Sequence, residues 1–254
     1  MQDADLLKSA LVKAGDVALA HFGKGPQQWQ KKDGSLLTAA DLEVNAVLHD
    51  LLGKARPDYG WLSEEGPDDP QRTSKKLCWI LDPIDGTRSF ADGRDEWCVA
   101  LALLENGVPT VSGVHHPLTR KLYLAEKGKG ATCNGAPIKV HDGVSLSGAK
   151  LAARSQARKR LEGSGFEQIN VAYVPQLARL ALLAEGSVDI VLSFGWKNDW
   201  DVAAGALLVT EAGGRITTEH GEAMIFNQAR PQQDGLVAAG ILRHAAVQQF
   251  METT

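Results

Sequence analysis

Two aspartates follow an apolar run in the segment WILDPIDGTRSF, residues 79–90. The apolar residues up to Leu81 predict a buried strand. Asp82 and Asp85 are therefore expected at the end of that strand, where open α/β sheets bind their ligands. Two carboxylates three residues apart repel each other unless a cation holds them. Because the ligands are oxygen atoms, the pattern favours Mg²⁺ or a similar hard ion.

The residues around these aspartates indicate an anion site beside the metal. Pro83 fixes φ and stiffens the chain between the two carboxylates. Gly86-Thr87 predicts the start of a helix, whose N–H groups would receive a phosphate. The alternative is a plain turn with Asp85-Gly86 as its turn residues.

Three further acidic segments accompany the first. They are TAAD with Asp41, WLSEEG with Glu64 and Glu65, and WDVAAGALLVTEAGG with Asp201. Each has a simpler interpretation, with Asp41 as a helix-dipole partner, the glutamates as solvated loop charges and Asp201 as an N-cap. The complete set, in this order, is what indicates a metal site.

The first half predicts helices packed on a mostly antiparallel sheet. Apolar residues recur at helical spacing from Leu6 to Ala18, and Thr38 would cap a second helix that extends to about Leu52. Glu105-Asn106-Gly107 is a strong hairpin signal. Strands are expected at 77–81, 99–104, 108–114, 121–126 and 138–140.

The second half predicts an α/β layer, since strand and helix patterns alternate. The polar, glycine-containing stretch His141–Ser147 is the best joint, so we expect two halves, 1–142 and 143–254. Strands are expected at 150–153, 189–192 and 236–239, and helices at 177–184, at 203–211 and after the last strand.

Composition limits the class of protein. The 254 residues are 44% hydrophobic and carry a formal net charge of −4, which argues against disorder and against an electrostatic nucleic-acid binder. The three cysteines lack metal-ligand spacing and predict free thiols. The N-terminus does not resemble a signal peptide, and no apolar run is long enough for a membrane helix. We expect a cytoplasmic protein without membrane or nucleic-acid partners.

The acidic segments resemble the signatures of one family. DPIDGT at 82–87 and WDVAAGALLVTEAGG at 200–214 are similar to the two motifs of the inositol monophosphatase superfamily, and GKGATCNG at 128–135 is similar to a third segment. That superfamily includes 3′(2′),5′-bisphosphate nucleotidases, fructose-1,6-bisphosphatases and some histidinol-phosphate phosphatases. The resemblance implies a layered αβαβα fold and hydrolysis of a small phosphorylated metabolite with two or three Mg²⁺ ions. It also implies lithium sensitivity and makes a homodimer plausible.

The resemblance also implies a role for each matching residue. Glu64, Asp82, Asp85 and the carbonyl of Ile84 would hold the first metal, and Asp82, Asp85 and Asp201 the second. Asp41 would support the metals through water, and Thr87 with Glu64 would activate the attacking water. Asp85 and the N–H groups of Gly86 and Thr87 would lie at the bound phosphate.

This sequence departs from the family pattern around the substrate. GTRSF places Arg88 beside the site, either against a substrate anion or exposed at the helix start. Phe194, next to Ser193, stands where inositol-specific members carry a glutamate, which puts myo-inositol 1-phosphate in doubt. Arg179 or Lys197 would replace a lysine expected in nucleotidases, or be surface charges. The substrate stays open between inositol phosphates, bisphosphate nucleotides and histidinol phosphate, and a regulatory binding role is the alternative outside catalysis.

Overall fold

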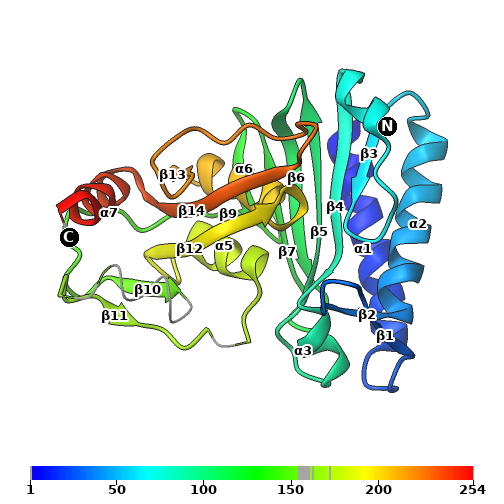
Figure 1. Ribbon diagram of the computed structural model, residues 1–254, viewed down its shortest axis with the longest axis horizontal. Helices are drawn as coiled ribbons and strands as arrows, with labels where there is room; N and C mark the ends of the chain where they lie inside the picture. The colour runs from blue at the N-terminus through cyan, green and yellow to red at the C-terminus, as the bar shows by residue number, and fades with distance from the viewer. Residues whose placement is uncertain (1, 154–160, 162, 172, 254) are drawn as a thin grey trace.

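Helices and sheets alternate in an αβαβα arrangement (Figure 1). This computed structural model describes residues 2–153, 161, 163–171 and 173–253. The layers are, in order, a helix pair, a seven-stranded sheet, a second helix pair, a five-stranded sheet and a last helix. The helices of these layers are α1 (Asp3–His21) with α2 (Ala39–Ala55), α5 (Gln176–Ala184) with α6 (Ala203–Glu211), and α7 (Ile241–Thr253).

The larger sheet carries Asp82, Ile84 and Asp85 of the predicted site and is mostly antiparallel, as expected. Its order is β3–β4–β5–β6–β7–β8–β9, in which only β3 and β4 run parallel. The predicted hairpin joins β5 to β6 through Asn106 and Gly107, which both adopt positive φ. The strands are β3 (Gly60–Ser63), β4 (Leu77–Asp85), β5 (Cys98–Glu105), β6 (Val108–His116), β7 (Lys121–Glu126), β8 (Gly130–Cys133) and β9 (Ala136–Pro137).

Side chains of β4 alternate between the two faces of this sheet. Trp79 and Leu81 pack with the buried faces of α1 and α2, whereas Cys78 and Ile80 join the core of the middle layer. This period of two follows from the pleat of a strand. Because both faces are covered, β4 is apolar along its whole length until Asp82.

The helix pair is connected by a small hairpin of β1 (Gln28–Gln30) and β2 (Leu36–Thr38). Thr38 ends that hairpin and caps α2, as predicted. Its side chain accepts from the N–H of Asp41, and the Asp41 carboxylate accepts from the N–H of Thr38. This reciprocal capping box fixes the carboxylate of Asp41 at the start of the helix.

The smaller sheet is mixed. Its order is β11–β10–β12–β14–β13, with β10 parallel to both neighbours and the other pairs antiparallel. The helices α5 and α6 lie between the two sheets, where the Ser112 hydroxyl of β6 donates to the Ala204 carbonyl of α6 at 2.9 Å. The strands are β10 (Lys150–Ala153), β11 (Glu167–Gln168), β12 (Ile190–Asn198), β13 (Gly214–Thr217) and β14 (Gln232–Gly240).

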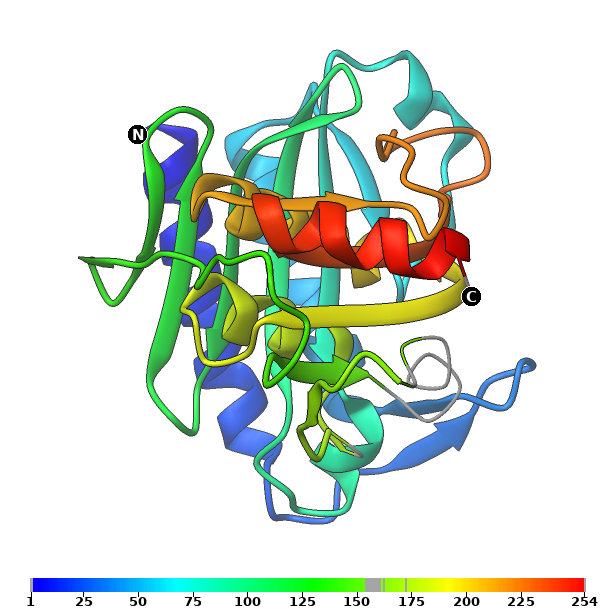
Figure 2. The same cartoon turned by 90° about the vertical axis from the view of Figure 1, so that its left-hand side faces the viewer.

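The last helix covers the outer face of the smaller sheet. Figure 2 shows α7 lying across β12 and β14. Val247 and Met251 of α7 pack against a cluster that includes Leu151, Ile190 and Val237. This apolar contact closes the final layer.

Most predicted elements are present, with shifted ends. The strand expected at 138–140 is wrong, because the pairing residues are Ala136–Pro137. The short strands β1, β2, β3, β8, β11 and β13 were not predicted. The division into halves at residues 142 and 143 stays a prediction, although each sheet draws its strands from one side of it. None of the described helices is long and apolar enough to cross a membrane.

Candidate active site

The site begins where the pairing of β4 with β5 becomes irregular. Asp82 lies opposite Ala100 and Asp85 opposite Cys98, with a register shift between the two aspartates. Pro83 cannot donate to a strand pair because it has no N–H. The irregular stretch therefore occupies the two residues that separate the aspartates, and it frees the carbonyl of Ile84 from the regular ladder.

A tight turn follows the strand. Gly86 has a φ of +100°, and a Cβ atom there would lie 2.7 Å from the carbonyl oxygen of Glu96, so only glycine fits. The helix predicted after it is present as α3 (Thr87–Ala91), with five residues. A helix of five residues has only a small dipole. Phosphate binding here would therefore depend on the N–H groups of Gly86 and Thr87.

The hydroxyl of Thr87 links the turn to α2. It lies 3.1 Å from Oδ1 of Asp41 and 3.1 Å from the carbonyl oxygen of Ile84, and it can donate to either. The second oxygen of Asp41 accepts from the Thr38 hydroxyl at 2.6 Å. Burial raises the pKa of Asp41, and the hydrogen bonds from Thr38 and Thr87 partly offset this. The sequence prediction thus placed Asp41 and Thr87 in one site, and they are in contact.

Three carboxylates from distant segments converge beside this turn. Glu64 follows β3, Asp82 lies in β4, and Asp201 ends a single 3₁₀ turn, Asp199–Asp201, directly before α6. Each offers an oxygen, and these oxygens all lie within 4.8 Å of one another. Asp201 was predicted to begin a helix, and its carboxylate accepts from the N–H of Asn198 at 3.1 Å.

The crowding changes the acidity of the cluster. Burial raises the pKa of Asp82 well above its usual value, and the charges of Glu64 and Asp85 add to the effect. Burial also raises the pKa of Asp201 to about 8, with further contributions from Asp85 and Glu64. The arrangement is costly for the protein alone, because each ionised carboxylate opposes the next.

The donor set fits a hard divalent cation. Oδ1 of Asp82 is buried and makes no hydrogen bond within the described residues. Such an atom normally has a partner. A cation at the centre of the three carboxylates would supply that partner and reverse the repulsion. Because every donor is an oxygen, Mg²⁺ suits the set better than a softer metal.

Lys31 is a neighbour that the sequence interpretation did not assign. Its ammonium group donates to Glu64 at 2.7 Å and to Glu65 at 2.6 Å. Burial alone would lower the pKa of Lys31, but its hydrogen bonds to the two glutamates and their charges outweigh burial and raise the pKa. Burial raises the pKa of Glu65 to about 7. No local pattern joins Lys31 to residues 33 positions away, so only the folded chain shows the contact.

Asp85 connects the cluster to the middle layer. Its Oδ2 accepts from the N–H of Leu177 at 2.6 Å, at the start of α5. The thiol of Cys98 lies 3.9 Å from the same oxygen. The carboxylate is thereby fixed toward α5, and it also lines a neighbouring pocket.

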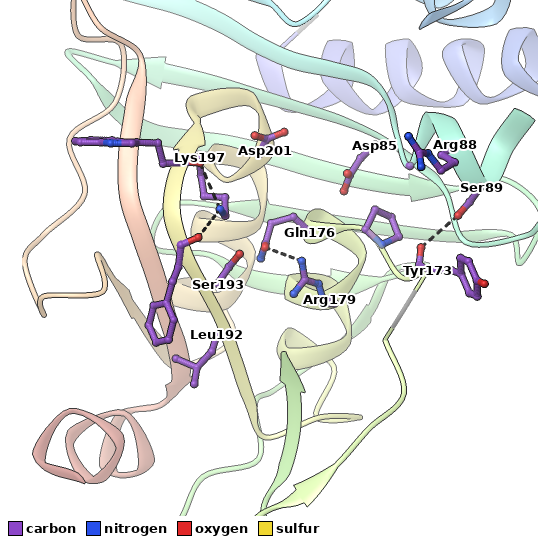
Figure 3. A pocket seen from close by; sticks show the side chains of 14 residues that line it. Asp85, Arg88, Ser89, Tyr173, Gln176, Arg179, Leu192, Ser193, Lys197 and Asp201 are labelled. Carbon is purple, nitrogen blue, oxygen red and sulfur yellow. Dashed lines mark hydrogen bonds between the residues drawn. The ribbon is translucent and has the colours of Figure 1, made fainter. Parts of the chain in front are cut away.

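That pocket has a volume of about 530 Å³ and extends from Asp85 and Asp201 along α5 and β12 (Figure 3). Arg88 lies exposed at its rim. Arg179 is only 3% exposed, so it is not a surface charge. Its guanidinium group donates to Oε1 of Gln176 at 2.8 Å, and both side chains line the pocket. Cationic groups therefore face the space beside the carboxylates.

Other predicted positions lie around the same pocket. Phe194 and Ser193 line it. Lys197 also lines it, but its ammonium group donates to the backbone carbonyls of Phe194, Gly195 and Trp196. His115 and His116 are adjacent in the sequence but do not line this pocket. A ring nitrogen of His115 lies 3.0 Å from the carbonyl oxygen of Leu11, and the ring of His116 contacts that of Tyr123, so the pair does not form a metal site.

Comparisons with known proteins agree with this geometry. The model of the inositol monophosphatase family matches residues 3–252. The Nus factor SuhB of Xylella fastidiosa is 32% identical, over 97% of this chain and 93% of that protein. A histidinol-phosphatase of Mycobacterium tuberculosis is 35% identical over 84% of this chain and 85% of its own.

The fold is also that of a solved relative. An IMPase of Thermotoga maritima superposes with a TM-score of 0.85 and 27% identity, covering all of this chain and 98% of its own. Sequence and fold therefore agree over nearly the full length. The chain belongs to the inositol monophosphatase family, whose members are phosphatases that hydrolyse phosphoric monoesters.

Proposed function

We propose that this phosphatase hydrolyses a small phosphorylated metabolite with two or three Mg²⁺ ions, by attack of water and without a covalent intermediate. The observation that carries the proposal is the buried Oδ1 of Asp82, which lacks a protein partner among the described residues. The same side chain offers an oxygen within 4.8 Å of oxygens of Glu64 and Asp201. Carboxylates at this density either take up protons or bind a cation, and a hard cation suits their oxygen atoms.

The metal ligands follow from the family motifs, and the convergence of Glu64, Asp82 and Asp201 supports three of them. Glu64, Asp82, Asp85 and the carbonyl of Ile84 would hold one ion. Asp82, Asp85 and Asp201 would hold another. When bound, such ions neutralise the phosphate, lower the pKa of water and stabilise the leaving oxygen.

The remaining roles belong to Asp41, Thr87, Glu64 and Gly86, of which Asp41 and Thr87 are in contact. Asp41 would accept a hydrogen bond from the Thr87 hydroxyl, so that the oxygen of Thr87 can accept one from the attacking water. Glu64 would accept the proton that this water loses. The N–H groups of Gly86 and Thr87 would bind phosphate oxygens, at a turn that only glycine can form.

The cationic side of the pocket would receive the rest of the substrate. Arg179 is buried and oriented by Gln176, so its guanidinium is fixed before a ligand arrives. Arg88 at the rim is freer to move. Both favour an anionic substrate, as a phosphate ester requires, and they leave inositol phosphates, bisphosphate nucleotides and histidinol phosphate as the alternatives.

Phosphate release from a panel tests the proposal. The panel holds inositol 1-phosphate, adenosine 3′,5′-bisphosphate, histidinol phosphate and fructose 1,6-bisphosphate, each with Mg²⁺ and with excess EDTA. One fast, EDTA-sensitive substrate is expected, and Asp85→Asn should abolish its turnover while the protein stays folded. Retained turnover in that variant would contradict the metal assignment.

Further properties are proposed on the family resemblance. Lithium should inhibit turnover by competing at the metal site. A homodimer would be visible by light scattering. The cytoplasm is the proposed location, and the three cysteines are free thiols, as a reducing compartment predicts.

A regulatory binding role is the second candidate, because one relative bears the name Nus factor SuhB. That role predicts a partner whose binding survives the loss of the metal site. If no phosphomonoester in the panel were hydrolysed, a pull-down with the Asp85→Asn protein would decide for or against it.

A further inference from the structure

The ring of Trp196 lies beside the candidate active site and is unusually well fixed. Trp196 belongs to β12, lines the pocket, and is 55% exposed. A single exposed indole needs no explanation. What distinguishes this one is that both its backbone and one face of its ring are held by other groups.

The backbone of this segment is held by hydrogen bonds. The strand loses its register with β14 immediately before Trp196. The ammonium group of Lys197 donates to the carbonyl oxygens of Phe194 at 2.8 Å, Gly195 at 3.0 Å and Trp196 at 3.3 Å. The N–H of Gly195 donates to Glu219 at 3.1 Å. The irregular segment that carries the indole is therefore preorganised, which lowers the entropy lost when a ligand binds.

One face of the indole is covered by a cation. The guanidinium carbon of Arg230 lies 4.4 Å from the centroid of the Trp196 ring. Arg230 is itself oriented, since its Nε donates to Oε1 of Gln232 at 2.7 Å. Arg230 and Gln232 line a neighbouring hollow of about 380 Å³, whereas Trp196 lines the substrate pocket. The guanidinium thus lies over one face of the indole, and the opposite face is not covered by it.

The pocket leaves room for a ring against that face. Its volume of about 530 Å³ is far larger than a phosphate group needs. The segment LSFGWKN, residues 192–198, has no carboxylate to accept hydrogen bonds from a polyol. On this side of the pocket, the flat aromatic surface of Trp196 is available instead.

We propose that Trp196 stacks on a flat heteroaromatic ring in the leaving group of the substrate. The substrate is then a phosphomonoester that carries such a ring, a nucleobase or an imidazole, and not a polyol phosphate. This inference rests on the proposed phosphatase activity at the same site. Stacking of one base on an aromatic side chain is worth about 5- to 150-fold in binding.

Matched substrate pairs test this inference. Adenosine 5′-phosphate is compared with ribose 5-phosphate, and adenosine 3′-phosphate with a methyl riboside 3-phosphate, so that each pair differs by the base. Histidinol phosphate is compared with glycerol 1-phosphate for the imidazole. The readout is the ratio of kcat/KM within a pair. We expect one pair to favour the ring-bearing ester in the native protein, and Trp196→Leu to lower that ratio by about 5- to 150-fold.

Tyr173 provides a matched control in the same pocket. Its ring is 48% exposed and is also stacked by an arginine, with Arg94 at 3.9 Å. Tyr173→Leu should leave the ratio of the favoured pair unchanged. If Tyr173→Leu lowers the ratio and Trp196→Leu does not, the assignment to Trp196 is wrong. If every pair has a ratio near one in the native protein, the heteroaromatic substrate class is wrong.

The same experiment distinguishes failure of the stacking proposal from failure of the proposed phosphatase activity. Release of phosphate from both members of each pair at equal rates would support the phosphatase and contradict the stacking. If no phosphate is released from any ester, the proposed function fails. Calorimetric dissociation constants of the same pairs, for the native protein and Trp196→Leu, then decide the stacking alone.

Discussion

Replacing Asp82 with asparagine should stabilise the metal-free protein and abolish its response to Mg²⁺. Asp82 is 2% exposed, and its neighbours Glu64 and Asp201 offer oxygens within 4.8 Å. At that separation, with an effective dielectric constant of about 20, each ionised pair costs about 3.5 kcal/mol. Because proton uptake already relieves part of this repulsion, we expect Asp82→Asn to add about 2 kcal/mol to the free energy of unfolding in EDTA.

Differential scanning calorimetry measures both parts of this prediction. About 2 kcal/mol corresponds to a rise in Tm of about 4–8 °C for a chain of this size. Mg²⁺ at ten times its Kd should raise the stability of the native protein by about 1.4 kcal/mol. The Tm of Asp82→Asn should not change with Mg²⁺, and its phosphatase activity should be lost.

Asp199 is the matched control, since it is also buried but has partners. Its oxygens accept from the side chain of Gln233 at 2.7 Å and from the N–H of Asn227 at 2.7 Å. In Asp199→Asn, one of the two accepting oxygens is replaced by an NH₂ group, which would face the N–H donor of Gln233 or of Asn227. The lost hydrogen bond should lower the free energy of unfolding by about 1–3 kcal/mol. If Asp82→Asn lowered Tm in EDTA as Asp199→Asn does, or kept its response to Mg²⁺, the cluster would not be a cation site.

Three other changes have defined outcomes. Thr87→Val removes the hydroxyl that Asp41 orients and should lower kcat at least about 100-fold in phosphate-release assays, whereas Thr87→Ser should retain most activity. Gly86→Ala places a Cβ 2.7 Å from a backbone carbonyl, at a φ of +100°, and should lower Tm by about 4–8 °C in calorimetry. Burial lowers the pKa of His244 to about 4. The unfolded chain takes up that proton near pH 6.5, so up to about 3 kcal/mol of stability is lost as the pH falls from about 6.5 to 4. Urea unfolding at pH 7 and pH 4.5 should show a smaller loss for His244→Gln; an equal loss would contradict the assignment.

Local patterns predicted the parts of the site that are local in the chain. Asp82 and Asp85 are fixed by the end of one strand, and Thr38 with Asp41 by a helix cap that spans four residues. The helix start at Gly86-Thr87 was predicted for the same reason. The family motifs added Glu64 and Asp201, whose distance in sequence exceeds any local period.

The contacts that the sequence did not predict join distant segments. Lys31 reaches Glu64 across 33 residues, and the N–H of Leu177 reaches Asp85 across 92. Neither residue type is unusual at its position. Arg179 had two open interpretations, and its burial in the pocket wall depends on how α5 packs between the sheets. Such contacts follow from layer packing, which has no short sequence signature.

The site also bears on how the layers stay together. Asp82 and Asp85 belong to the larger sheet, whereas Asp201 follows the long strand β12 of the smaller sheet. Repulsion between Asp82 and Asp201 therefore acts across the middle layer, and a cation bound by both would oppose it. Apolar packing of α5 and α6 has to hold the sheets together whenever the cation is absent. The same carboxylates that make the site useful for phosphate chemistry thus place a cost on the fold, which is why the metal-free protein should gain stability when one of them is removed.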